Sequence, residues 1–485
     1  MNRRYYPYII VGIVSILLSS LYCPPRNLYS DDKEIFKFIG YLIKRGSIPY
    51  KDFFDHKPPL IFFFNYWEAV IGSWGWWIAD AALVCYASLQ FLTINLKYKI
   101  AWPVVLPILF NLILRHYVSF GIGMTREYST IFLLLGFCLV LSNNRFKYIK
   151  LGLLSALIFF MQQDQTVILA PFIIYLLLTT EESFGFVKKI THLVLGGFTI
   201  LVPIVTYFIW KDALEEFWQH SFLFNFQWYT SPDKKPGLIQ ELIAIKGVMY
   251  LLKFEIIIMG TLFLTMASLV VGTTKKWLLV ASIVSIPLSF ISELLSGNLV
   301  TKLAFCYYYF LPLAATLPFA LFLVFAFTKN QIFNQKTHQI IFASLFLLNP
   351  IMSIAEHTAN YYRYPQNLVA QTAEMKFLDK QSLQDNQLYV MNNSSYIYAY
   401  NKYQIKAPSK WLYHYFWNWY EQWDKDNLII QSIISDLKKH KTQYIIDYST
   451  ERHFMRKPIY DTWLHFKDSS YTQLKPLNIW QLKPY

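Results

Sequence analysis

The chain has 485 residues, of which 55% are hydrophobic, 19% aromatic and only 15% charged. Soluble domains usually carry about 25% charged residues, so this composition excludes an ordinary soluble enzyme. The net charge of +14 would suit a nucleic-acid partner, but in an apolar chain basic residues mainly mark cytoplasmic loops. We therefore expect a multi-pass protein that is surrounded by membrane lipids and does not bind nucleic acid.

The first apolar segment, residues 8–22, follows Arg3 and Arg4. A charged start before an apolar run is typical of a secretory signal. However, Tyr22, Cys23 and the two prolines that follow make a poor cleavage site. We predict an uncleaved first span that begins in the cytoplasm.

A polar loop at residues 24–76 follows this span and is predicted to lie outside the membrane. Within it, apolar residues recur at helical spacing over 33–44, which predicts a short helix on the membrane surface. Residues 60–71, after Pro58 and Pro59, form a second apolar segment. A crossing needs about 20 apolar residues, so we expect this shorter segment to be interfacial as well.

Whether residues 60–71 cross the membrane decides on which side of it every later loop lies. If they do not cross, nearly all lysine- and arginine-rich loops fall on the cytoplasmic side, as the positive-inside rule requires. We therefore predict about eleven spans: 8–22, 77–96, 102–120, 128–142, 151–161, 166–180, 191–210, 249–272, 277–295, 305–327 and 338–354.

From residue 356 onward, charged and amide residues return. The sequence predicts short strands at 388–390, 396–400 and 444–448, and an amphipathic helix at Leu428–His440. A dense aromatic tract at 411–423 predicts a domain core or an interfacial belt rather than a sugar-stacking surface. The predicted fold is therefore an all-α polytopic membrane domain, residues 1–355, with a small external α/β domain, residues 356–485.

The predicted outer face gathers acidic and basic residues from segments that are far apart in the sequence: Asp31, Asp32, Asp55, His56, Lys57, Arg115, His116, Arg126, Glu127, Asp164, His220 and Lys302. A charge inside a span costs about 2.5–3.5 kcal/mol, so a position at a span end has a simple structural explanation. Two separate outer segments that each place acid beside base nevertheless favour an active site.

The run Gly46–Leu60, GSIPYKDFFDHKPPL, with Asp32 upstream of it, resembles the first outer loop of the GT-C membrane glycosyltransferases. The branch it is most similar to contains the protein O-mannosyltransferases and the lipid A aminoarabinose transferase. Gly123–Glu127, GMTRE, resembles the second outer loop of that family, and YYYFLPL from Tyr307 resembles its late tyrosine-and-proline motif. Relatives commonly have Asp-Glu in the first motif. Here Asp32 is followed by Lys33 and preceded by Asp31, so Asp31 remains an alternative to Asp32.

This resemblance implies an enzyme that transfers a sugar, with inversion, from a polyprenyl-phosphate donor to an acceptor glycan, lipid or protein. The active site would face the outside of a bacterial plasma (inner) membrane. An inverting displacement needs a base on the acceptor side, and Asp32 is the candidate. Glu127 would orient the acceptor or pair with Arg126 or Lys57. The departing phosphate needs cations, for which Lys57 and Arg126 are the first candidates and Lys302 and Tyr307 the next.

No cofactor is required by this chemistry. Some relatives hold a divalent metal near the first motif, and Asp55 and His56 are the residues that would bind it here. A solvated histidine is the alternative.

Two other functions stay open. A transporter or flippase of lipid-linked sugars would need broken helices and buried ionisable residues near the bilayer midplane. A glycan polymerase or ligase would use the same outer face. Because the charged residues crowd one outer surface, the sequence favours the transferase, but it identifies neither the sugar nor the acceptor.

Overall fold

The computed structural model describes residues 3–24, 31–117, 123–179, 185–229, 277–282, 284–285, 288, 311–327, 369–391, 393–412, 423–448 and 457–484. The chain divides into two compact units. Unit 1 contains residues 1–27, 74–206 and 232–364, and unit 2 contains residues 28–73, 207–231 and 365–485.

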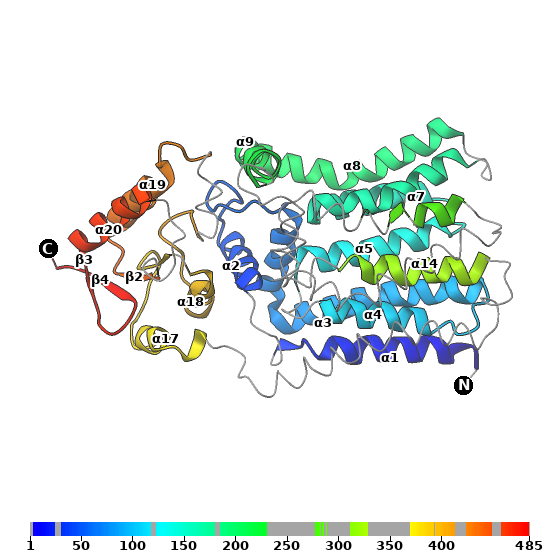
Figure 1. Ribbon diagram of the computed structural model, residues 1–485, viewed down its shortest axis with the longest axis horizontal. Coiled ribbons are helices and arrows are strands. Elements are labelled where there is room, and N and C mark those ends of the chain that lie inside the picture. Colours follow the sequence, from blue (N-terminus) through cyan, green and yellow to red (C-terminus); the bar gives the residue numbers. More distant parts are fainter. Residues whose placement is uncertain are drawn as a thin grey trace, which may run out of the picture. The chain divides into compact units, whose positions relative to one another are not determined.

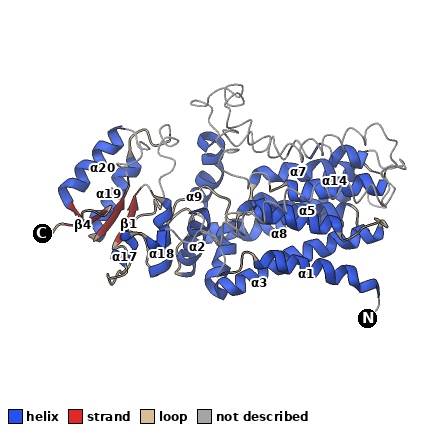
Figure 2. Ribbon diagram, turned by 60° about the horizontal axis from the view of Figure 1, so that its bottom comes forward, coloured by secondary structure: helices blue, strands red, loops and turns tan. Residues whose placement is uncertain are grey.

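Unit 1 is a bundle of apolar helices that lie side by side (Figures 1 and 2). Its described helices are α1 (Tyr6–Ser20), the second part of α3 (Leu60–Lys97), α4 (Val105–Tyr117), α5 (Thr125–Val140), α6 (Lys147–Met161), α7 (Thr166–Leu178), most of α8 (Phe186–Trp210) and α14 (Leu313–Phe327). Helix α5 packs against α6, α7 and α14, and α4 packs against α1 and α14. Two short 3-10 turns, η1 (Arg3–Tyr5) and η3 (Gln163–Gln165), precede α1 and α7.

Close helix contacts in this bundle depend on glycine. A Cβ added at Gly152 of α6 would lie 1.9 Å from the backbone oxygen of Leu193 in α8. A Cβ added at Gly196 of α8 would lie 2.0 Å from the backbone oxygen of Ile149. Small residues that let two backbones approach are typical of helix packing in membranes.

These helices match predicted spans one to seven and ten in position. Two described helices, Leu60–Lys97 and Phe186–Trp210, are long and apolar enough to cross a membrane by themselves. The predicted spans 249–272 and 338–354 lie outside the described residues, as does most of 277–295. The count of about eleven crossings therefore stays a prediction.

Helix α3 contains a break at Gly72, whose φ of 78° and ψ of 163° are not helical. Only glycine adopts such a positive φ without strain. The break separates residues 60–71 from 77–96, which the sequence predicts to be two different segments.

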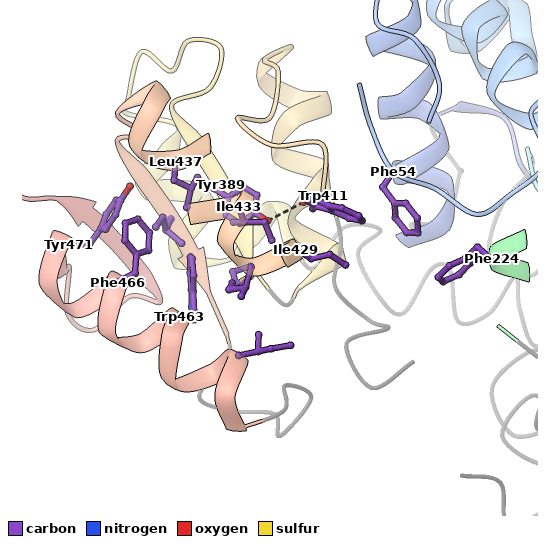
Figure 3. Packing of buried hydrophobic residues seen from close by; sticks show 14 residues of the cluster. Phe54, Phe224, Tyr389, Trp411, Ile429, Ile433, Leu437, Trp463, Phe466 and Tyr471 are labelled. Carbon is purple, nitrogen blue, oxygen red and sulfur yellow. Dashed lines mark hydrogen bonds between the residues drawn. The ribbon is translucent and has the colours of Figure 1, made fainter. Parts of the chain in front are cut away.

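Unit 2 contains a four-stranded sheet of β1 (Leu388–Met391), β2 (Tyr444–Asp447), β3 (Tyr471–Gln473) and β4 (Ile479–Leu482), in the order β1-β2-β4-β3. Strands β1 and β2 are parallel, and the other two pairings are antiparallel. Helices α19 (Leu428–His440) and α20 (Lys457–Ser470) pack beside the sheet (Figure 2). Their buried side chains, among them Ile433, Leu437, Trp463 and Phe466, form the core shown in Figure 3.

The remaining elements of unit 2 are short except for α2 (Asp31–Lys44). They are α9 (Leu214–Trp218), the π-helical turns η4 (Gln219–Leu223) and η5 (Asn225–Tyr229), the 3-10 turns η7 (Val369–Gln371) and η8 (Ser394–Tyr396), α17 (Ala373–Leu378) and α18 (Ile397–Tyr403). Helix α2 confirms the helix predicted at 33–44 and begins two residues earlier. A Cβ on its Gly40 would lie 2.3 Å from the backbone oxygen of Asn65, so α2 packs directly on the first part of α3.

The predicted strand at 396–400 is wrong, because this segment is helical. The Asn393 side chain accepts a hydrogen bond from the Ser395 amide at 3.2 Å and starts the turn η8. Helix α18 then buries Ile397 and Tyr400 on one face. The predicted strands at 388–390 and 444–448 and the helix at Leu428–His440 are confirmed. The predicted domain boundary at residue 356 lies outside the described residues.

Candidate active site

One polar cluster lies inside the helices of unit 1 and centres on Arg115 of α4. Its guanidinium donates from Nη1 to Glu127 Oε1 at 2.7 Å and from Nη2 to Asp80 Oδ2 at 2.9 Å. Nη2 also donates to Ser19 Oγ at 2.9 Å, and the Tyr22 hydroxyl donates to the Arg115 backbone oxygen at 2.6 Å. The side chains of Arg115, Asp80 and Glu127 are fully buried. The cluster therefore joins α1, α3, α4 and α5 through charged hydrogen bonds.

Glu127, the predicted second acidic residue, is held by both of its carboxylate oxygens. Oε1 accepts from Arg115, and Oε2 accepts from the Gly123 amide at 2.9 Å. Gly123 has a φ of +103°, which favours glycine. The sequence predicts that Glu127 orients the acceptor or pairs with Arg126 or Lys57, and the structure shows an ion pair of Glu127 with Arg115. Asp80 was missed, although a lone acid within a long apolar segment is itself a signal of function or pairing.

Arg126 is also buried, and the residues around it on α5 continue the polar cluster. Thr125 donates to Gln162 Oε1 at 2.8 Å, and Ser129 bonds to Gln165 at the start of α7. The last turns of α1, α4 and α6 thus meet the first turns of α5 and α7 at one end of the bundle. The predicted alternation of these spans requires this arrangement.

The second group of predicted residues lies in unit 2, at the first turn of α2. Asp31, Asp32 and Glu34 all fall in this turn, where the helix dipole favours negative charge. Asp31 accepts hydrogen bonds from the Ser394 hydroxyl at 2.6 Å and the Ser395 hydroxyl at 2.9 Å. The acidic turn is therefore tied to residues far along the chain.

Two further contacts fix α2 in place. Asn401 Nδ2 donates to Glu34 Oε2 at 2.6 Å and to the Glu34 backbone oxygen at 2.8 Å. The Phe38 ring stacks on Tyr400 of α18 with 4.9 Å between centroids. Burial raises the pKa of the Glu34 carboxyl above its usual range, against the opposing effects of Lys37 and of the hydrogen bond from Asn401.

The loop that carries the GSIPYKDFFDHKPPL run is folded back on itself. Asp55 and His56 are buried, and Asp55 Oδ1 accepts from the Lys57 amide at 2.8 Å. The Tyr50 hydroxyl donates to the Lys57 backbone oxygen at 2.6 Å, and Asn225 Nδ2 donates to the His56 backbone oxygen at 2.8 Å. The backbone of Lys57 is thus fixed on both sides, while its side chain remains partly exposed.

Aromatic packing anchors the same loop. The Phe54 amide donates to the Lys410 backbone oxygen at 2.8 Å. The Phe54 ring lies 5.0 Å from Trp411 and 5.5 Å from Phe224, measured between centroids (Figure 3). Trp411 and Trp423, the two described ends of the aromatic tract, belong to this core or pack against it. Residues 413–422 of the tract lie outside the described residues.

The described residues contain no group of three or more His, Cys, Asp or Glu side chains that could hold a metal ion. His56 Nδ1 lies 3.8 Å from Asp55 Oδ1, and that carboxylate oxygen already accepts the Lys57 amide.

The predicted site residues therefore fall into two sets. Asp31, Asp32, Asp55, His56 and Lys57 belong to unit 2, and the structure brings Asp55, His56 and Lys57 together in one turn. Arg126 and Glu127 belong to unit 1. Lys302 and Tyr307 lie outside the described residues. A single cavity that joins these sets stays a prediction.

No protein-family model matches the chain, and no curated protein matches it. Among solved structures, the apo crystal structure of the Archaeoglobus fulgidus oligosaccharyltransferase is similar to it, with 11% sequence identity and a TM-score of 0.48. The similarity covers 92% of this chain and 70% of that one.

Proposed function

We propose that the chain is an inverting membrane glycosyltransferase. It would move a sugar from a polyprenyl-phosphate donor to an acceptor glycan, lipid or protein on the outer side of a bacterial plasma membrane. One observation carries the proposal: the GSIPYKDFFDHKPPL run is an anchored loop with buried Asp55 and His56, close in sequence to the acidic first turn of α2. A loop that served only as a surface connection would have no reason to bury charged side chains.

In the proposed reaction, Asp32 accepts the acceptor hydroxyl proton while the acceptor oxygen forms a bond to the anomeric carbon. The bond from that carbon to the phosphate oxygen breaks on the opposite face, which inverts the configuration. Polyprenyl phosphate leaves with the electron pair and needs no proton. Lys57 and Arg126 are the cations proposed to stabilise its charge.

The contacts of Asp31 suit it to a structural role in the turn. Both Asp31 oxygens accept hydroxyl hydrogen bonds, from Ser394 and Ser395. A carboxylate that is engaged in this way is suited to hold the turn in place, and the spacing of the sequence motif makes Asp32 the proposed base. Glu127, held by Arg115 and Gly123, would fix the second outer loop and with it the position of Arg126.

The test uses purified full-length protein in lipid nanodiscs with radiolabelled polyprenyl-phosphate sugars and a panel of acceptors. Asp32→Asn is expected to lower transfer by at least about a hundredfold, as for loss of a general base. The matched control is Asp461→Asn, the same chemical change at an exposed position on α20. Transfer by Asp32→Asn at the wild-type rate would refute the assignment.

A carrier of lipid-linked sugars is the second candidate, because Asp80, Arg115 and Glu127 form a buried ionisable cluster among apolar helices. Liposomes that hold the labelled lipid in one leaflet separate the two functions. A transferase produces labelled acceptor, whereas a carrier moves the lipid and leaves the sugar attached. A polymerase or ligase would be recognised by products that contain whole glycans.

A further inference from the structure

The acidic first turn of α2 touches a turn that lies more than 360 residues later in the chain. Ser394 Oγ donates to Asp31 Oδ2 at 2.6 Å, and Ser395 Oγ donates to Asp31 Oδ1 at 2.9 Å, across 363 and 364 residues of sequence. Both partners belong to unit 2. We propose that Ser394 and Ser395 are positioning residues of the transferase: they hold Asp31 and so fix the turn that carries Asp32. This inference rests on the proposed function.

The position of the two serines next to the sheet supports this role. They form η8, which follows the carboxyl end of β1 beside the parallel strand β2. In α/β sheets, functional residues characteristically lie beyond the carboxyl ends of parallel strands. Here that edge presents its hydroxyls to a carboxylate beside the proposed base.

The turn η8 is itself held firmly. Asn393 accepts the Ser395 amide, and Ser394 is buried. The hydroxyls of Tyr396 and Tyr448 are 2.8 Å apart, and their rings stack at 5.4 Å. The Tyr396 hydroxyl also donates to Glu374 Oε2 at 3.2 Å. The hydroxyls that contact Asp31 are thus delivered from a rigid turn, as precise positioning requires.

The chemistry of the donors also fits a positioning role. A lysine or arginine opposite Asp31 would satisfy the carboxylate but would place a positive charge beside the proposed base. A serine hydroxyl donates one hydrogen bond and carries no charge. Two serines therefore orient both Asp31 oxygens and leave the charge of the acidic turn unchanged.

The test is a kinetic double-mutant cycle on full-length protein in nanodiscs, with the labelled polyprenyl-phosphate donor. Ser394→Ala/Ser395→Ala is expected to lower kcat about tenfold or more, because hydrogen bonds to charged groups are worth this much, with the donor KM unchanged. Ser395→Thr, which keeps a hydroxyl, is expected to retain activity. Ser469→Ala, an exposed serine on α20, is the control.

In an Asp31→Ala background, the double alanine change is expected to cause no further loss, because its effect passes through Asp31. Additive losses in that background, or a double variant with wild-type kcat, would overturn the inference. A loss of kcat that comes with a lowered unfolding midpoint and is not rescued by Ser395→Thr would also overturn it, since a structural role would then suffice. A wild-type protein without transfer refutes the proposed function itself, which separates the two failures.

Discussion

Removal of Arg115 is the sharpest test of the polar cluster in unit 1. Arg115→Gln deletes a buried cation and leaves the carboxylates of Asp80 and Glu127 without their shared partner. Three hydrogen bonds from the guanidinium are lost, at 2.7, 2.9 and 2.9 Å. All three charged side chains are fully buried, so water does not replace the missing partner.

The expected cost is about 3–5 kcal/mol, the range for a buried ion pair that loses one member. Typical proteins have a free energy of unfolding of about 5–15 kcal/mol, so the variant should lose about a fifth of its stability or more. The triple variant Arg115→Gln/Asp80→Asn/Glu127→Gln removes every charge together. It should recover most of the loss, because no uncompensated charge is left buried.

The assay is reversible unfolding in mixed micelles titrated with sodium dodecyl sulfate. The control is Arg45→Gln, which breaks an equally short pair with Asp385 whose side chains are about one-third exposed, at 36% and 35%. Exposed pairs contribute about 0–1 kcal/mol, so this variant should stay close to wild type. Equal losses for Arg115→Gln and Arg45→Gln would refute the reasoning, as would a triple variant no more stable than the single one.

Three further predictions concern unit 2. Glu34→Gln should stabilise the protein at neutral pH and make its stability less dependent on pH. Burial raises the pKa of this carboxyl, so the native state binds the proton more tightly than the unfolded state and stability falls as pH rises. Unfolding midpoints at pH 5 and pH 8 measure this, and an unchanged difference between them would contradict it. Burial, with repulsion from Lys410, lowers the pKa of His220 from 6.5 to about 4. The contribution of neutral His220 to stability is full above pH 6.5 and declines by up to about 3 kcal/mol as pH falls toward 4. His220→Gln should therefore make the protein less sensitive to acid between these values. Equal acid unfolding midpoints for the variant and the wild type would argue against this. Gly40→Ala should cost more than about 2 kcal/mol, because its methyl group would meet the Asn65 backbone at 2.3 Å; the same unfolding titration tests this, and a neutral effect would show that α2 shifts easily.

Elements with a strong local pattern could be predicted from the sequence. Helix α2 buries Ile35, Phe36, Ile39 and Leu42, four of the five apolar residues whose spacing predicted it, and leaves the fifth, Ile43, partly exposed. Helix α19 begins and ends where its pattern indicated. The break at Gly72 falls between two segments that were separated by length alone. In each case the information lies within a few turns of chain.

The segment at 396–400 shows where local pattern fails. Alternating tyrosines suggested a strand, but the cap at Asn393 and the burial of Ile397 and Tyr400 on one face decide for a helix. Strands β3 and β4 were not predicted, because their short runs carry little periodicity. They are stabilised by pairing within the sheet, β4 with β2 and β3 with β4.

The candidate site shows a similar division. Sequence motifs identified Asp31, Asp32, Glu127 and the loop at 46–60. They gave no sign that Arg115 and Asp80 complete one cluster, or that Ser394 and Ser395 reach Asp31. Partners separated by tens to hundreds of residues leave no fixed spacing in the sequence, so only the folded chain shows them.

The contact between Asp31 and Ser394 also has a consequence for biosynthesis. The acidic turn is made early, and its partner follows 363 residues later. At about 5–20 residues per second, a ribosome needs roughly 20–70 s to make the intervening chain. During that time the early turn lacks the hydroxyls that orient it. A truncated or stalled product would therefore carry the proposed base without its support, and activity would begin only once the last part of the protein has been made and has folded back.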